Sequence, residues 1–316
     1  MADGRYAGRT VLVTGATGFL GAHLVGALLA EGAIVHAIRR NPASGTRLPL
    51  EGIRWHLADI LDPSSLSHAL AAARPEIVFH LAAYGTTFDQ RDPALAIRVN
   101  VEGSWNLWKA LGAGTTTRFV HTGSCGEYGQ VKGQVTESVL CEPTWLYPAT
   151  KNASVTILST LGRETGTEVV TLRPFGPYGS ADDPRRIIPH AILSLLRGET
   201  VPVTAGEQLR DFAHVDDQVQ AFIVAGVVRL PRTGAIYNVG SGVVVTLKQV
   251  LTTIAEAVGG DALSRIAFGA IPYRDSEVWE MCCDISAARR DLEYAPRISL
   301  QEGIARTVEW FRERRI

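Results

Sequence analysis

The chain has 316 residues, of which 46% are hydrophobic and 20% are charged, and its formal net charge is −1. This composition is typical of a folded globular protein and excludes long disordered or fibrous segments. A net charge near zero gives no general attraction for nucleic acid or anionic lipid, so we expect neither as a partner.

The N-terminal residues MADGRYAGRT contain no apolar stretch, and no later run reaches the roughly 20 apolar residues that a membrane span requires. The four cysteines (Cys125, Cys141, Cys282 and Cys283) lack the spacing of metal ligands. We therefore expect reduced thiols, no bound metal and a cytoplasmic location.

Short β-branched runs alternate with helical patterns in the first half of the chain. These runs predict strands at residues 10–14, 34–38, 53–56, 77–80, 118–122 and 168–172. Most of them are nearly all apolar, which favours parallel strands covered on both faces. The alternation predicts an α/β protein with a doubly wound, parallel Rossmann sheet.

After Pro174, prolines and glycines separate short segments, and helical patterns return near residues 186–197, 216–228 and 247–258. No flexible linker lies between the two halves, so we expect two lobes that share a cleft. Residues 1–173, with a return segment at about 212–240, are predicted to form the dinucleotide-binding domain. Residues 174–211 and 241–316 are predicted to form a smaller, mixed substrate-binding lobe.

A glycine-rich turn follows the first predicted strand and opens a helix. Its glycines are Gly15, Gly18 and Gly21, in the sequence VTGATGFLGAHL. Glycine allows a tight turn and a close approach of the backbone to a pyrophosphate, which the positive end of the helix dipole attracts. Plain punctuation between strand and helix is the alternative, and it explains the combined pattern less well. The turn predicts a dinucleotide site that also includes Thr17, Phe19 and Leu20.

Two arginines, Arg39 and Arg40, follow the second predicted strand, where NAD-binding proteins usually carry an acid for the ribose. A guanidinium can pair with a 2′-phosphate through two hydrogen bonds, whereas a carboxylate would repel it. The arginines therefore favour NADP(H), with NAD(H) possible. The alternative is that both are simply solvated side chains at a strand end.

Tyr147 and Lys151 are four residues apart, which places both side chains on one face of a helix. A neighbouring ammonium stabilises a phenolate and so brings a tyrosine into the useful range for proton transfer. Such a pair is common on surface helices, so its meaning depends on the surrounding sequence. Here it lies between HTGSCGEYG, residues 121–129, and LRPFGPYG, residues 172–179.

In this order, with the G-x-x-G-x-x-G spacing of the turn, these motifs resemble extended short-chain dehydrogenases that act on nucleotide sugars, over essentially the whole chain. The resemblance implies a catalytic set of Ser124, Tyr147 and Lys151, with Asn100 in a structural role. Further cofactor contacts are implied at Asp59, Ile60, Leu81, Ala82, Ala83, Tyr147, Lys151 and Pro174.

The resemblance also implies a nucleotide-sugar substrate. Arg210 and Arg274 match arginines that hold the diphosphate, for which a planar, permanent charge is suited. Thr86 and Thr87, with Ser124 and Tyr147, are candidate contacts of the sugar. Gly176 replaces an asparagine that commonly touches the phosphate in relatives. A homodimer through helices near residues 102–111 and 150–162 is also implied.

The reaction is less well defined than the family. Dehydratases of this group carry an acid pair where this chain has Cys125 and Gly126, which cannot act as general acid and base. Because Arg39 favours an exchangeable NADPH, we expect an NADPH-dependent 4-ketoreductase of a nucleotide-linked 4-keto-6-deoxyhexose. The alternatives are a 4-epimerase with tightly bound NAD, a reductase of a small ketone, and a non-catalytic dinucleotide-sensing regulator.

Overall fold

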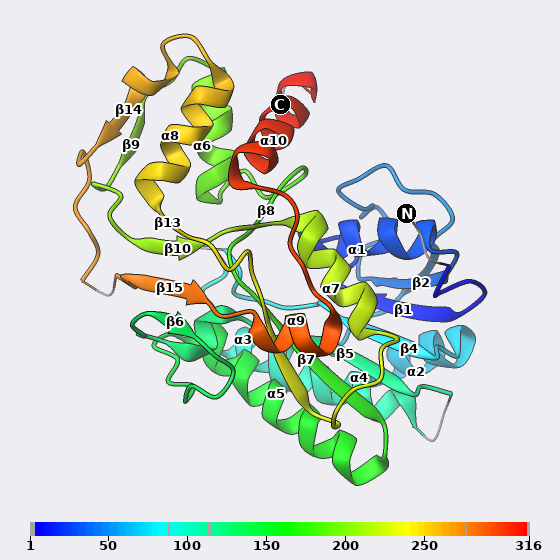
Figure 1. Ribbon diagram of the computed structural model, residues 1–316. Coiled ribbons are helices and arrows are strands. Elements are labelled where there is room, and N and C mark those ends of the chain that lie inside the picture. Colours follow the sequence, from blue (N-terminus) through cyan, green and yellow to red (C-terminus); the bar gives the residue numbers. More distant parts are fainter. Residues whose placement is uncertain (1–3, 88, 113–114, 276, 315–316) are drawn as a thin grey trace.

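The computed structural model describes residues 4–87, 89–112, 115–275 and 277–314. Its centre is a seven-stranded parallel sheet in the order β12-β7-β5-β4-β1-β2-β3 (Figure 1). The strands are β1 (Thr10–Thr14), β2 (Ile34–Arg39), β3 (Arg54–Leu57), β4 (Ile77–His80), β5 (Arg118–Thr122), β7 (Glu168–Pro174) and β12 (Ala235–Val239). The predicted doubly wound Rossmann sheet is confirmed.

All six predicted strands form, and their ends differ from the predicted ones by no more than two residues. The seventh strand, β12, falls within the predicted return segment, but the sequence pattern did not identify it as a strand. The reason is Asn238, which is polar yet fully buried. Its side chain accepts a hydrogen bond from the Tyr128 hydroxyl at 2.7 Å and donates one to the Val135 carbonyl at 2.8 Å.

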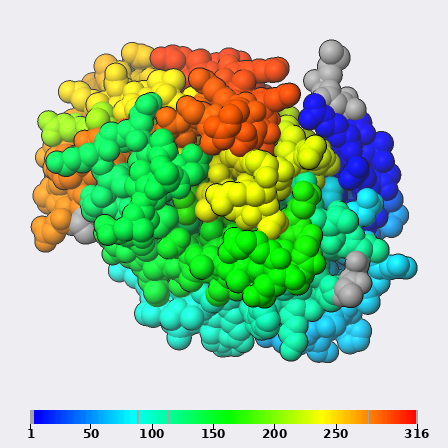
Figure 2. All heavy atoms as spheres, turned by 60° about the horizontal axis from the view of Figure 1, so that its bottom comes forward, coloured from blue at the N-terminus to red at the C-terminus, as the bar shows by residue number. Residues whose placement is uncertain are grey.

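Helices cover both faces of the sheet, as the apolar strands require. One face packs against α1 (Phe19–Ala30), α7 (Val215–Ala225) and α9 (Ser286–Leu292). The other packs against α2 (Pro63–Ala73), α4 (Gly103–Leu111) and α5 (Leu146–Thr165). The short α3 (Pro93–Ile97) continues through the π-helical turn η1 (Arg98–Glu102) into α4. Figure 2 shows α5, in green, exposed on this second face.

A smaller lobe lies beside the carboxyl ends of the central strands (Figure 1). Its mixed sheet has the order β13 (Val244–Thr246), β10 (Leu209–Asp211), β15 (Glu280–Cys283) and β6 (Gln134–Val135). Its helices are α6 (Ile187–Leu196), α8 (Leu247–Val258) and α10 (Leu300–Arg314), which share a second core. Two short strand pairs complete the lobe: β9 (Val201–Val203) with β14 (Ile266–Phe268), and β8 (Pro177–Tyr178) with β11 (Ala213–His214). The 3₁₀ turn η3 (Ala262–Arg265) precedes β14.

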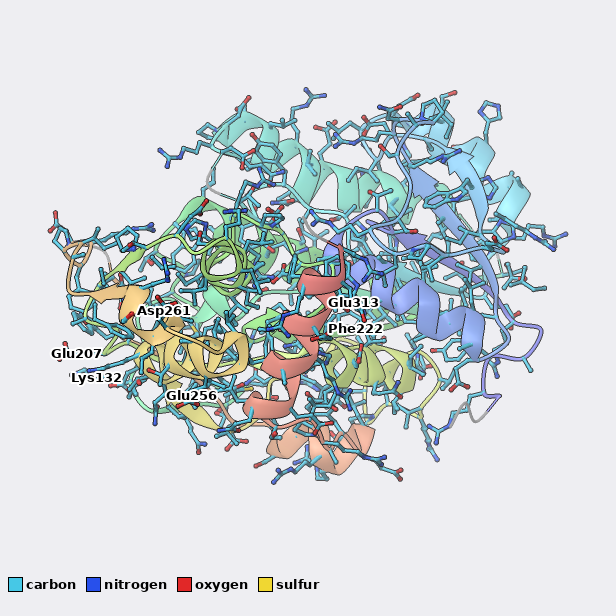
Figure 3. The ribbon with its side chains drawn as sticks, turned by 90° about the horizontal axis from the view of Figure 1, so that it is seen from above. Lys132, Glu207, Phe222, Glu256, Asp261 and Glu313 are labelled. Carbon is cyan, nitrogen blue, oxygen red and sulfur yellow. The ribbon has the colours of Figure 1, made fainter. Side chains whose placement is uncertain are left out.

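The two halves of the chain are in contact beyond the sheet. β6 comes from the first half of the chain but pairs with β15 of the small lobe. The preceding loop, which carries Lys132, reaches the same edge of the molecule as Glu207 (Figure 3), and the Gly133 N–H donates to Glu280 Oε2 at 2.5 Å. The predicted domain boundaries remain a prediction. Among the described residues, every helix is too short or too polar to cross a membrane.

Candidate active site

The glycine-rich turn has the geometry of a phosphate cradle. Gly15 has a φ of +73°, and a Cβ there would lie 2.7 Å from the Ala82 nitrogen. A Cβ on Gly21 would lie 2.1 Å from the Gly15 carbonyl oxygen, so helix α1 can approach the turn only without a side chain at this position. No side chain caps the N-terminus of α1 at Gly18. The first N–H groups of α1 are therefore available to an anion, and the turn, with Thr17, Phe19 and Leu20, fits a pyrophosphate.

Arg39 lies at the end of β2, but its side chain already has partners. The guanidinium lies 5.0 Å from the centre of the Trp55 ring on β3, and Nη1 donates to the Ser44 carbonyl at 3.1 Å. Arg40 is exposed. Among the described residues, no contact thus holds either arginine in a pocket shaped for a 2′-phosphate.

The remaining predicted cofactor residues lie at the carboxyl ends of neighbouring strands, around the turn. Asp59, which follows β3, accepts the Leu61 N–H at 2.9 Å, and Ile60 is buried against Gly103. The Ala82 N–H donates to Thr14 Oγ1 at 3.2 Å, which holds the segment Leu81, Ala82 and Ala83 beside the turn. Pro174 ends β7. In an open parallel sheet, ligands bind at this edge, where the strand order reverses between β1 and β4.

The three predicted catalytic residues come together from two elements. Tyr147 and Lys151 lie on α5, and Ser124 caps the short 3₁₀ turn η2 (Cys125–Tyr128). The Ser124 side chain lies close enough to Tyr147 to act on its pKa. Burial raises the pKa of Tyr147, and the nearby Glu127 carboxylate raises it further. Burial lowers the pKa of Lys151 to about 8, against the opposing effect of Glu127. The surroundings of Tyr147 thus favour its protonated form.

Glu127 and Arg173 form a buried ion pair that the sequence reasoning missed. Arg173 Nε donates to Glu127 Oε2 at 2.8 Å, and Glu127 Oε1 accepts the Ser124 N–H at 2.7 Å. Both side chains are almost fully buried. The signal was present in the sequence, because Ser124-x-x-Glu127 has the spacing of a capping box, in which an acid binds back to the N-terminal residue of a turn.

Asn100 has the structural role that was predicted for it. Its side chain, in η1, exchanges two hydrogen bonds with the Tyr84 backbone, each at 2.8 Å. It also donates to Thr150 Oγ1 at 2.8 Å, one residue before Lys151. Asn100 therefore ties the loop after β4 to the start of α5.

The predicted substrate-binding residues lie farther apart than the predicted catalytic residues. Arg210 on β10 forms an ion pair with Glu277 at 3.1 Å, and its charge acts on Cys125, beside the triad. Arg274 is exposed on the loop before β15. Thr86 donates to Gln90 Oε1, and Thr87 beside it is partly buried. Among the described residues, no hydrogen bond joins either threonine to the triad. Gly85, which precedes them, packs directly against the Tyr147 ring.

Residues 180–186, here called the mouth strap, connect β8 to α6 and cross the edge at which the cofactor residues lie. The strap contacts the segments after β1, β2 and β4. The Ser180 carbonyl lies 2.8 Å from His23 Nε2 on α1, Asp183 pairs with Arg47 at 3.2 Å, and Arg185 pairs with Asp89 at 2.7 Å. At the end of the strap, the Arg186 guanidinium lies 5.9 Å from the centre of the Phe19 ring and lowers the pKa of Tyr147.

A parallel Rossmann sheet, this glycine-rich turn and a Ser-Tyr-Lys set define the class of extended short-chain dehydrogenases. The sequence profile of the NAD dependent epimerase/dehydratase family matches residues 11–240. The chain belongs to this family, which confirms the resemblance and the expectation of an enzyme.

Similar proteins in this family act on nucleotide sugars. The chain is 33% identical to a UDP-glucose 4-epimerase of Mycolicibacterium smegmatis, over 96% of this chain and 98% of the relative. The structure of a UDP-glucose 4-epimerase from Thermotoga maritima with UDP-glucose is 29% identical, with a TM-score of 0.88 over 97% and 99% of the two chains. The dTDP-glucose 4,6-dehydratase DesIV from Streptomyces venezuelae with NAD is 28% identical, with a TM-score of 0.85 over 96% and 97%. The bound cofactor there is NAD, so the predicted preference for NADP(H) finds no support.

Proposed function

We propose that this protein is a 4-epimerase of a nucleotide-linked hexose that keeps NAD bound through its catalytic cycle. The observation that carries the proposal is the mouth strap, which is tied to three segments of the cofactor crevice. An epimerase regenerates its cofactor within each turnover and so has no need to release it. The similarity to two UDP-glucose 4-epimerases supports the same reaction.

The chain's own residues account for the proton transfer. Tyr147 removes the proton from the C4 hydroxyl and returns it after the sugar has presented its other face. Ser124 binds the C4 oxygen, and the Lys151 ammonium stabilises the phenolate of Tyr147. A bound nicotinamide would supply the acceptor and the donor of the C4 hydride. Arg210 and Arg274 are the proposed contacts of the diphosphate, and Thr86 and Thr87 those of the sugar.

Dehydration is disfavoured by the residues beside Ser124. Removal of water needs an acid and a base near C5 and C6 of the sugar. Cys125 and Gly126 stand there, and burial raises the pKa of the Cys125 thiol to about 11, which keeps it neutral. We therefore expect this chain to share the fold of the dehydratases but not their reaction.

The second candidate is an NADPH-dependent 4-ketoreductase of a nucleotide-linked 4-keto-6-deoxyhexose. The observation that favours it is the position of Arg39 and Arg40 at the end of β2, where a 2′-phosphate would lie. A reductase must exchange its cofactor in every cycle, which would require the mouth strap to open each time.

One experiment separates the two reactions. One portion of the purified protein is denatured, and the nicotinamide that it releases is identified. A second, native portion is incubated with UDP-glucose without added cofactor. Retained NAD and formation of the C4 epimer support the epimerase. A protein that is free of cofactor, consumes NADPH with a 4-keto sugar nucleotide and leaves UDP-glucose unchanged refutes it.

We further propose a homodimer and a cytoplasmic location. Ile97 and Trp105, on the face that carries α4 and α5, are about half exposed. Exposed large apolar side chains favour burial against a second copy. The cysteines are all free in the structure, in agreement with a reducing compartment. Light scattering of the purified protein tests the dimer.

A further inference from the structure

We infer that Glu127 is a positioning residue of the active site: its buried carboxylate fixes the backbone that carries Ser124 and sets the charge balance around Tyr147 and Lys151. This inference rests on the proposed hydride-transfer function.

The geometry shows how Glu127 acts on Ser124. Oε1 of Glu127 accepts the Ser124 N–H at 2.7 Å, while the Gly126 N–H donates to Ser124 Oγ at 3.2 Å. Because Oγ already accepts one bond, its hydrogen is available for donation to Tyr147 or to a substrate oxygen. A Cβ on Gly123 would lie 2.7 Å from Glu127 Oε1, so the carboxylate reaches this position only because residue 123 is glycine.

Burial raises the pKa of the Glu127 carboxyl, and the Arg173 guanidinium on its far side opposes this effect and pairs with the carboxylate. Arg173 also donates to the Tyr128 hydroxyl at 2.8 Å and contacts Cys141 Sγ at 3.1 Å, which anchors it away from the triad. The titratable groups around the carboxylate are Arg173 on β7, Tyr147 and Lys151 on α5, Cys125 and Tyr128 on η2, and Cys141 in the loop that follows.

The carboxylate acts on Tyr147 and Lys151 in the same direction. It raises the pKa of the Tyr147 phenol, and it raises the pKa of Lys151 against the effect of burial. Removal of its charge therefore lowers both pKa values. Activity that needs an ionisable Tyr147 and a charged Lys151 must then shift to lower pH on both limbs of its profile.

Two substitutions separate the effect of the Glu127 charge from the effect of its side-chain length. Glu127→Gln keeps the length and an acceptor oxygen but removes the charge, so we expect the pH profile of kcat to move by roughly one unit toward acid. Glu127→Asp keeps the charge but withdraws the carboxylate from the Ser124 N–H, so we expect kcat to fall roughly tenfold with the profile in place. The matched control is Glu137→Gln. Glu137 is a partly buried carboxylate that accepts the Asn238 N–H at 2.7 Å, and its substitution should leave the pH profile of kcat unchanged.

The test uses the protein with its retained cofactor, and circular dichroism and cofactor content report folding. If Glu127→Gln leaves Arg173 unpaired and the protein unfolds, the double variant Glu127→Gln/Arg173→Met removes both buried charges, and the acid shift should remain. Folded Glu127 variants with the kcat and pH profile of the wild type overturn the inference.

Failure of the proposed function is distinguishable from failure of this inference. If the wild type turns over no sugar nucleotide, the ionisation of Tyr147 is followed by ultraviolet difference titration, with Tyr147→Phe as the blank. Phenolate that forms at lower pH in Glu127→Gln than in the wild type supports the role of Glu127. Ionisation at the same pH refutes it.

Discussion

Tyr147 carries the proposed chemistry, yet its surroundings disfavour the ionised form. Burial and the Glu127 carboxylate both raise its pKa, while the Ser124 hydroxyl and the Arg186 charge lower it. His80 and His121 lie near Lys151, and burial keeps both neutral, with the pKa of His80 lowered to about 3. The two imidazoles near Lys151 are thus neutral.

Replacement of the Tyr147 hydroxyl should stop turnover without loss of the fold. Tyr147→Phe removes the proton carrier but keeps the ring that packs against Gly85. We expect turnover to fall by about 10²–10⁴-fold, with cofactor content unchanged. Steady-state kinetics and analysis of bound nicotinamide measure both. Tyr237→Phe, which removes a hydroxyl that contacts Asp291 at 3.2 Å, is the control and should remain active. Near-normal turnover of Tyr147→Phe would remove this residue from its role.

Arg39 is the position at which the predictions for the two cofactors differ. A carboxylate there would repel a 2′-phosphate and could bind the ribose hydroxyls, so Arg39→Asp should raise the affinity for NAD relative to NADP. Fluorescence titration of the cofactor-free protein with NADH and NADPH measures the ratio. Arg54→Asp, an exposed change on β3, is the control. An unchanged ratio in Arg39→Asp would show that Arg39 serves only its contacts with Trp55 and Ser44.

At the scale of elements, the turn between β1 and α1 depends on contacts between backbones. Gly21→Ala would force a Cβ against the Gly15 carbonyl, whereas Gly26→Ala on the same helix would make an ordinary contact with Leu50 at 3.4 Å. We expect Gly21→Ala to cost about 1–3 kcal/mol of stability and to weaken cofactor binding. Gly26→Ala should be neutral or stabilise by about 0.5–1 kcal/mol. Urea unfolding and cofactor titration of both variants test this; equal behaviour of the two would contradict it.

The elements that the sequence predicted are those whose pattern is local. Runs such as residues 10–14 and 118–122 are apolar throughout and follow turn signals, so strand and boundary are both readable. Asn238 breaks this pattern in β12, because its partners, Tyr128 and Val135, are about 100 residues away in the chain.

The residues of the candidate site also fall into those that a local sequence pattern predicts and those that it does not. The glycine turn and Tyr147-x-x-x-Lys151 have fixed spacings, which can be recognised from the sequence alone. The Glu127–Arg173 pair and the mouth strap join residues from distant segments, and only the fold brings their charges together. Arg39 is an intermediate case: its position at a strand end was correctly predicted, but its stacking on Trp55 depends on the register of β2 and β3.

At the scale of the whole molecule, the small lobe reaches the cofactor crevice through the mouth strap. Asp182 and Asp183 are buried within it, and the neighbouring arginines hold the pKa of Asp183 well below its usual range. Asp183 therefore stays charged and paired at neutral pH. Under the proposed function, a bound cofactor leaves when the contacts of the strap open. On this proposal, cofactor retention is a property of the contact between the lobes.

Asp183→Asn should loosen this contact without a change at the triad. Asp183 pairs with Arg47 and with Arg185, and both arginine side chains are at least partly exposed. The loss of these pairs is therefore worth about 1 kcal/mol, and we expect release of the bound cofactor to accelerate roughly fivefold. Added salt should speed release in the wild type and have less effect in the variant, because screening and substitution remove the same interaction. Exchange against labelled NAD measures the rate. Glu199→Gln, which removes an exposed pair with Arg197 at 2.9 Å, is the matched control. Equal, salt-independent release from all three proteins would mean that the strap does not retain the cofactor, and the case for the epimerase would then rest on similarity alone.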